Sequence, residues 1–235
     1  CFEHNVVGIP YCIGPIWWSM MRFDLHAHSK YSPKCGYMEP KVIAKLARKK
    51  GLDGIAITDH DTIKGALETR EYADKDLTVI TGSEVMTSRG EVIGLFLSDE
   101  ILSTDLIDVI EEIHDQNGVA IVPHPFDTLR RSALWPTEND VKYLDGVEGF
   151  NARNVYQKSN MDAIEFGKKY KLAITAGSDA HFSNEVGNAG VITDNDDLRE
   201  AILARQIEIF GKRNAIYNHA FTKGLKLCRK IKRSL

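Results

Sequence analysis

The chain has 235 residues, with 30 Lys and Arg against 33 Asp and Glu, a formal charge of -3 and a hydrophobic share of 43%. This composition is typical of a globular protein and excludes disordered, collagen-like and coiled-coil chains. A chain of this length buries enough surface to fold without a disulfide or a metal ion, so a metal site in it would serve chemistry.

The cysteines and the hydropathy bear on the compartment. The four cysteines are scattered and form no CxxC pair, which favours a reducing compartment and argues against a thiolate zinc site. No segment reaches the roughly 18 apolar residues of a membrane helix. We therefore expect a cytoplasmic protein.

The two ends of the chain differ from its middle. Residues 1–20 are apolar and aromatic, contain two prolines and lack the basic start of a secretory signal, so we expect an extension outside the functional domain. Residues 223–235 hold six basic residues and no acid. This tail could contact nucleic acid, or it could be a helix that ends in solvated cations. Residues 21–222 are left as one domain.

Short apolar runs alternate with amphipathic stretches through this domain, which predicts alternating strands and helices. The predicted strands are Arg22–Leu25, Gly54–Thr58, Thr78–Thr81, Val92–Leu97, Val119–Val122, Gly146–Phe150, Leu172–Thr175 and Glu208–Phe210. The predicted helices are one from Pro40 to Gly51, one capped by Ser103 or Thr104 and stopped by Gly118, Asp162–Tyr170 and Asp197–Arg205. Because most strands are continuous apolar runs, we expect parallel strands. Seven or eight such units favour a closed α/β barrel over an open sheet, although the spacing alone is compatible with both.

Histidines and acids gather where the predicted strands end. They are His26 and His28, then Asp59, His60 and Asp61, then Glu84, then His124, and finally Asp179 and His181. In α/β barrels the catalytic groups occupy these carboxyl ends. Imidazoles suit zinc, iron and manganese, and carboxylates can bridge two such ions. The pattern predicts a centre with several metal ions at the mouth of the barrel.

Five motifs in this order and spacing resemble the PHP family, the polymerase and histidinol phosphatase domain. They are Asp24-Leu25-His26-Ala27-His28-Ser29, Thr58-Asp59-His60-Asp61, Gly82-Ser83-Glu84, Pro123-His124-Pro125 and Gly177-Ser178-Asp179-Ala180-His181. The resemblance implies a distorted (β/α)7 TIM-like barrel in a single domain. It also implies an enzyme that holds two or three divalent ions (Mn, Zn or Fe) and hydrolyses phosphate esters.

The same resemblance implies a role for each ligand. His26, His28 and Asp179 would hold one ion, Glu84 would bridge to a second ion held by His124, and His60 with His181 would serve a third.

The chain departs from the family pattern at two places. Where many members have Ser-Asp-Gly, Ser32 is followed by Pro33 and Lys34, so we expect the third ion to have fewer protein ligands. Glu91 stands three residues before Gly94, where the family often has a histidine ligand. We interpret Glu91 as a substitute ligand of the second ion; the alternative is an exposed charge beside a hairpin turn.

Phosphate recognition needs cations, and arginine matches phosphate oxygens with two donors. Arg153 follows the strand Gly146–Phe150, and Arg130 or Arg131 follows His124, although each could be a solvated loop arginine. The catalytic set that we predict is His26, His28, Glu84, Asp179 and Arg153. The expected mechanism is attack on phosphorus by a hydroxide that bridges two ions, with no protein nucleophile.

The substrate class follows from the absence of a polymerase region or a large insertion. We expect a small phosphorylated metabolite, a nucleotide or a short oligonucleotide, and no membrane partner. One alternative is a histidinol-phosphate phosphatase, and another is a metal-containing ribonucleoprotein subunit that binds RNA through its basic tail. The oligomeric state is not predicted.

Overall fold

The computed structural model describes residues 20–33, 35–215, 217–218, 221–222 and 224. Except for Met20, the predicted extension lies outside the described residues, and so does the basic tail except for Gly224. Within the described part, no helix has the length and apolar character needed to cross a bilayer.

Nine strands and five helices follow one another along the described chain. The strands are β1 Met21–Asp24, β2 Gly54–His60, β3 Thr78–Thr87, β4 Gly90–Leu95, β5 Val119–Val122, β6 Gly146–Asn151, β7 Ala173–Gly177, β8 Ala189–Thr193 and β9 Glu208–Gly211. The helices are α1 Pro40–Lys49, α2 Lys64–Glu71, α3 Leu106–Asp115, α4 Gln157–Tyr170 and α5 Leu198–Leu203.

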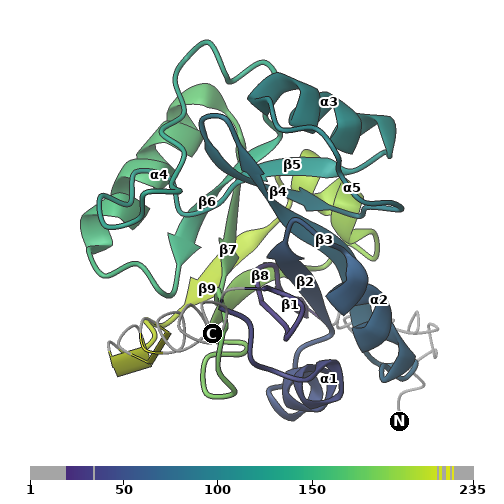
Figure 1. Cartoon of the computed structure of the whole chain (residues 1–235). Coiled ribbons are helices and arrows are strands. Elements are labelled where there is room, and N and C mark those ends of the chain that lie inside the picture. The colour runs from purple at the N-terminus through teal and green to yellow at the C-terminus, as the bar shows by residue number, and fades with distance from the viewer. Residues whose placement is uncertain (1–19, 34, 216, 219–220, 223, 225–235) are drawn as a thin grey trace, which may run out of the picture.

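All nine strands form one sheet in the order β7-β6-β5-β4-β3-β2-β1-β8-β9. The pairs β1–β2, β2–β3, β5–β6 and β6–β7 are parallel, whereas β4 and β8 run against their neighbours. The first strand of this order, β7, lies beside β8 and β9, so the sheet nearly closes on itself, and the helices lie around its outside (Figure 1). The prediction of an α/β barrel in a single unit is confirmed.

The strands and helices differ from the prediction in four respects. The strand β8 was not predicted, nor was the helix α2 between β2 and β3. The strand β3 continues beyond Thr81 to Thr87, because it pairs with β4 as an antiparallel hairpin. The expectation of parallel strands is therefore wrong at β4 and β8. A buried strand is equally apolar in either pairing, so its apolar sequence does not reveal its direction.

Two smaller errors concern helix starts. The N-cap of α3 is Asp105, whose side chain accepts a hydrogen bond from the backbone N–H of Ile107, rather than Ser103 or Thr104. The helix α4 begins at Gln157, one turn before the predicted start at Asp162. By contrast, α1 starts at Pro40 as predicted, and the chain leaves it through Gly51 with a φ of 68°, a value that suits glycine.

Side chains alternate between the inside and the outside of the barrel. Residues from seven strands, including Ala56, Ile80, Ile93 and Ile121, pack into one interior cluster. Their chain neighbours pack outward against the helices, as Ile55 and Ile57 do against α1. Because strand side chains alternate with a period of two, the inward rows continue along each strand toward its end. These rows bring polar residues to the mouth of the barrel.

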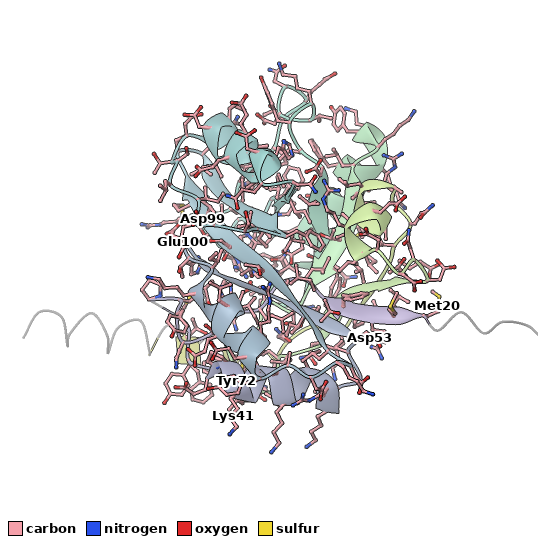
Figure 2. All side chains as sticks on the ribbon, turned by 90° about the vertical axis from the view of Figure 1, so that its right-hand side faces the viewer. Met20, Lys41, Asp53, Tyr72, Asp99 and Glu100 are labelled. Atoms are coloured by element: carbon pink, nitrogen blue, oxygen red, sulfur yellow. The ribbon has the colours of Figure 1, made fainter. Side chains whose placement is uncertain are left out.

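The two ends of the barrel differ. Figure 2 shows Met20 and Asp53, which directly precede β1 and β2, on the opposite side of the molecule from Glu100. Glu100 accepts hydrogen bonds from Thr62 and from the backbone of Ile63, just beyond the carboxyl end of β2. A cavity of about 630 Å³ lies at the amino end, lined by Asp53 among others, and none of the predicted ligands lines it.

Candidate metal centre

The predicted ligands converge at the carboxyl ends of the strands. The two Nε2 atoms of His26 and His28 lie 3.1 Å apart. Glu84 lies between His124 and His60. One Glu84 oxygen is 2.8 Å from Nε2 of His124, and the other is 3.2 Å from Nδ1 of His60. All these side chains are buried except that of His60, which is 23% exposed. Solvent therefore reaches the cluster beside His60.

Four overlapping groups of residues have donor atoms within 4.8 Å of one another. They are His26–His28–Glu84, His26–His124–Asp179, His28–Asp179–His181 and His60–Glu84–Glu91. Every residue that was predicted as a metal ligand belongs to at least one of them.

The grouping differs from the predicted division among three ions. His60 lies with Glu84 and Glu91, whereas His181 lies with His28 and Asp179. How these ligands divide among the ions, including the pairing of His60 with His181, stays a prediction. Where the family has an acid after Ser32, the chain has the exposed Pro33, and the Ser32 hydroxyl lies against a histidine instead.

Backbone pairing between the first and last parallel strands closes the site. Ala27 and Ala180 form an isolated parallel bridge, and the backbone N–H of Asp179 donates to the carbonyl of His26. Thus the loop after β1 and the loop after β7 continue side by side beyond the strands. This contact places His26 and His28 against Asp179.

Hydrogen bonds on the far side of each imidazole fix its orientation. Nδ1 of His26 donates to Glu148 at 3.1 Å, and Nδ1 of His28 lies 3.0 Å from the hydroxyl of Ser32. Asp59 accepts hydrogen bonds from the hydroxyls of Ser29 and Ser32. Partners of this kind set the tautomer and turn the free Nε2 toward the centre.

Glu148 is a buried acid of the candidate site that the sequence analysis missed. It is 2% exposed, and its second oxygen accepts from the backbone N–H of His124 and from the amide of Asn151. Its signal in the sequence is an acid in the middle of an apolar strand, because a buried carboxylate needs partners. A Cβ atom on Gly177 would lie 2.3 Å from Cβ of His26 and 2.7 Å from Glu148, so only glycine leaves room for this pair.

The electrostatics of the cluster reflect its crowded carboxylates. Burial raises the pKa of Glu84, but the histidines around it, led by His26, hold that pKa well below its usual range. Burial, and then the charge of Glu84, raise the pKa of Glu91 to about 8. Burial also opposes the charged form of His26, but its carboxylate neighbours, led by Glu148, raise its pKa well above its ordinary value. Burial and the charge of Glu84 therefore both oppose the ionisation of Glu91.

Two further observations fit the residues to divalent ions. Oδ1 of Asp179 is buried and has no hydrogen-bond partner among the described residues, yet it lies 3.4 Å from Nε2 of His28. His124 and Asp179 both have positive φ values, 31° and 50°. Such backbone costs on the order of 1–3 kcal/mol for each residue and is typical of functional sites. A bound cation would satisfy the free oxygen and permit both glutamates to be charged.

The arginines correct one prediction. Arg153, which was expected to face the substrate, is buried in an ion pair with Glu185 at 2.7 Å and donates to Thr222. The cation beside the cluster is Arg130, which donates to Asp179 and Asp127 and is 22% exposed. Of the predicted arginines, Arg130 is the one that contacts a predicted ligand, and Arg131 beside it is exposed.

Comparisons with known proteins agree with this geometry. The model of the PHP domain matches residues 24–217. Two uncharacterized proteins of Methanocaldococcus jannaschii are similar: MJ1587 is 43% identical over 56% of this chain and 82% of its own length, and MJ0417 is 38% identical over 72% and 69%. A two-domain protein of Bacteroides vulgatus containing a predicted PHP-like metal-dependent phosphoesterase superposes with a TM-score of 0.70 at 22% identity, covering 90% of this chain and 70% of that one.

Proposed function

The chain belongs to the PHP domain family, and from this premise we propose that it is a metal-dependent phosphoesterase that hydrolyses phosphate esters of small metabolites, nucleotides or short oligonucleotides. The observation that carries the proposal is the convergence of five histidines with Glu84, Glu91 and Asp179 at one end of the barrel. An enzyme that used general acid–base catalysis without metal ions would need only one or two such groups.

The ions would be held by the four overlapping groups, with Glu84 and Asp179 shared between groups. When bound, such ions act as Lewis acids and activate water as a nucleophile near neutral pH. Glu148 keeps the proton of His26 on Nδ1, and Ser32 orients His28, so the Nε2 atoms stay free. Arg130 lies beside Asp179 and would bind phosphate oxygens with its guanidinium. No side chain needs to act as the nucleophile.

Aromatic side chains next to the ligands favour a nucleotide among the substrate classes. Phe126, two residues after His124, packs edge-on against Trp135 with ring centroids 5.5 Å apart. Phe182, directly after His181, packs against Phe221 at 6.3 Å. Both outer rings are more than half exposed. Exposed rings of this kind stack on nucleobases without selecting among them.

The test combines metal analysis with a substrate panel. We expect the purified protein to hold divalent metal and, with manganese, to release phosphate from mononucleotides. His26→Ala and His28→Ala should each lose bound metal and activity while circular dichroism shows an intact fold, because the apolar clusters of the barrel contain neither histidine.

The matched control is His114→Ala. His114 is a histidine in the last turn of α3 that pairs with Asp145, outside the four groups. Wild-type turnover in either His26→Ala or His28→Ala would refute the proposal. A panel that gives turnover only with histidinol phosphate would select the histidinol-phosphate phosphatase, and RNA binding without any hydrolysis would select the ribonucleoprotein alternative.

A further inference from the structure

The four ligand groups are not chemically equal. Three of them contain two imidazoles and one carboxylate. Of the groups found among the described residues, His60–Glu84–Glu91 is the one with two carboxylates and a single imidazole. Imidazole suits zinc and iron, whereas carboxylate oxygen and water suit manganese and magnesium.

Glu91 reaches this group because of its place on the hairpin. It is the inward-facing residue of β4 in the row that continues with Ile93 and Leu95, and Glu84 lies on the same face of β3, opposite Ile93. Its two oxygens lie 3.6 Å from Nδ1 of His60 and 3.6 Å from Nε2 of His124. Glu91 is 4% exposed, so it is a buried acid facing the cluster and not a surface charge beside the turn.

The permanent cation nearest the two glutamates, Arg130, acts on both only at longer range, because its own ion pairs are with Asp179 and Asp127. Their ion-pair partners in the described part of the chain are histidines, with no lysine or arginine among them. Two buried carboxylates repel each other unless a cation lies between them. The partial exposure of His60 also leaves access for water, which hard cations retain in their coordination sphere.

We propose that the groups of the metal centre prefer different metals. The His60–Glu84–Glu91 group binds a hard, oxygen-preferring cation such as Mn²⁺, and the three groups with two histidines bind Zn²⁺. Glu91 is then the residue that sets the preference. The inference rests on the proposed function only in requiring that the cluster binds ions, and it needs no turnover.

Metal content measured without substrate tests the proposal. The full chain is stripped of metal, dialysed against excess Mn²⁺ with a limiting supply of Zn²⁺, desalted and analysed for both elements, with Mn²⁺ also followed by electron paramagnetic resonance. We expect the wild type to retain manganese beside zinc. Glu91→His should lower the manganese-to-zinc ratio by roughly 10–100-fold, the range seen when ligand surroundings are altered.

Two further variants complete the design. Glu91→Gln, which keeps the shape of the side chain, should lose manganese while retaining zinc. Glu138→His, which places an imidazole at an exposed glutamate outside the cluster, should behave as the wild type. The proposal is overturned if zinc displaces manganese from the wild type as fully as from Glu91→His. No step of this test uses a phosphate ester. A protein that binds manganese and zinc as expected but hydrolyses no phosphate ester would therefore refute the proposed function and leave this inference standing.

Discussion

Glu148 gives the sharpest test of how the protein prepares its histidines. In Glu148→Gln the side chain keeps its shape, but one of its two acceptor oxygens becomes a donor. If the amide nitrogen faces His124 and Asn151, it meets two donors, the backbone N–H and the amide group. If the amide nitrogen faces His26 instead, Nδ1 must become an acceptor, and the proton moves to Nε2. Either orientation damages the site.

The magnitude follows from these contacts. Loss of a hydrogen bond that orients a metal ligand lowers metal affinity by roughly 10–100-fold, or about 1.4–2.7 kcal/mol. A buried donor left without an acceptor costs about 1–3 kcal/mol of stability. We therefore expect Glu148→Gln to bind Zn²⁺ and Mn²⁺ more weakly and to be less stable even without metal.

Competition with a chelating dye measures the affinity, and urea unfolding with and without EDTA measures the stability. Glu112→Gln is the matched control, because Glu112 likewise accepts hydrogen bonds from two N–H groups, here the backbone amides of Leu102 and Ser103, but contacts no histidine of the cluster. It should lose stability without losing metal affinity. Wild-type metal affinity in Glu148→Gln would show that this carboxylate does not position His26.

Three further outcomes are expected. Arg130→Ala should lower kcat/KM for a phosphomonoester by roughly 10²-fold at saturating metal and, because Arg130 donates to Asp179, should also weaken metal binding; Arg130→Lys should restore part of both, as kinetics and elemental analysis would show. The bidentate hydrogen bonds from Arg89 lower the pKa of Asp140 to about 2, so Asp140→Asn should cost about 1–2 kcal/mol at pH 7, reduced by the exposure of Arg89. Because the folded-state pKa lies below the unfolded value of 3.8, this stabilisation is complete above pH 3.8 and is lost as the pH falls through 2, which urea titrations across that range would reveal. Deleting residues 223–235 should leave hydrolysis of a small phosphomonoester unchanged and raise KM only for longer anionic substrates, a result that a loss of small-substrate turnover in folded protein would contradict.

The positions of the ligands could be predicted because they depend on rules that act along a single strand. Polar residues directly after apolar strands lie at one end of an α/β barrel, and His26 and His28 share a face because they are two residues apart. Glu91 was found through the family pattern instead, and the inward row of its strand explains why it reaches the cluster. For His26 and His28, the position along one strand is enough to predict the end and the face of the barrel on which the side chain lies.

Other features depend on pairings between distant segments, which the sequence does not display. Arg153 follows a strand just as a phosphate-binding arginine would, but Glu185, which lies 32 residues later, captures it in a buried ion pair. The antiparallel direction of β8 depends on its pairing with β1, and the apolar sequence of a strand does not indicate its direction in the sheet. Glu148 was visible as an acid within a strand, but its partner His26 lies 122 residues away.

The β3–β4 hairpin explains how the metal preference of this centre could change without a change of fold. The register pairs Met86 with Glu91 and Glu84 with Ile93, so the backbone alone fixes which side chains point inward. A histidine at position 91 would start from the same Cα and the same inward row, and the interior packing of Ile93 would not be disturbed. Because the donor type at this one position alters the charge of the group but not the barrel, metal selectivity and folding stability can vary independently here. Glu91→His should therefore shift the metal content while its unfolding midpoint without metal falls no further than that of Glu91→Gln.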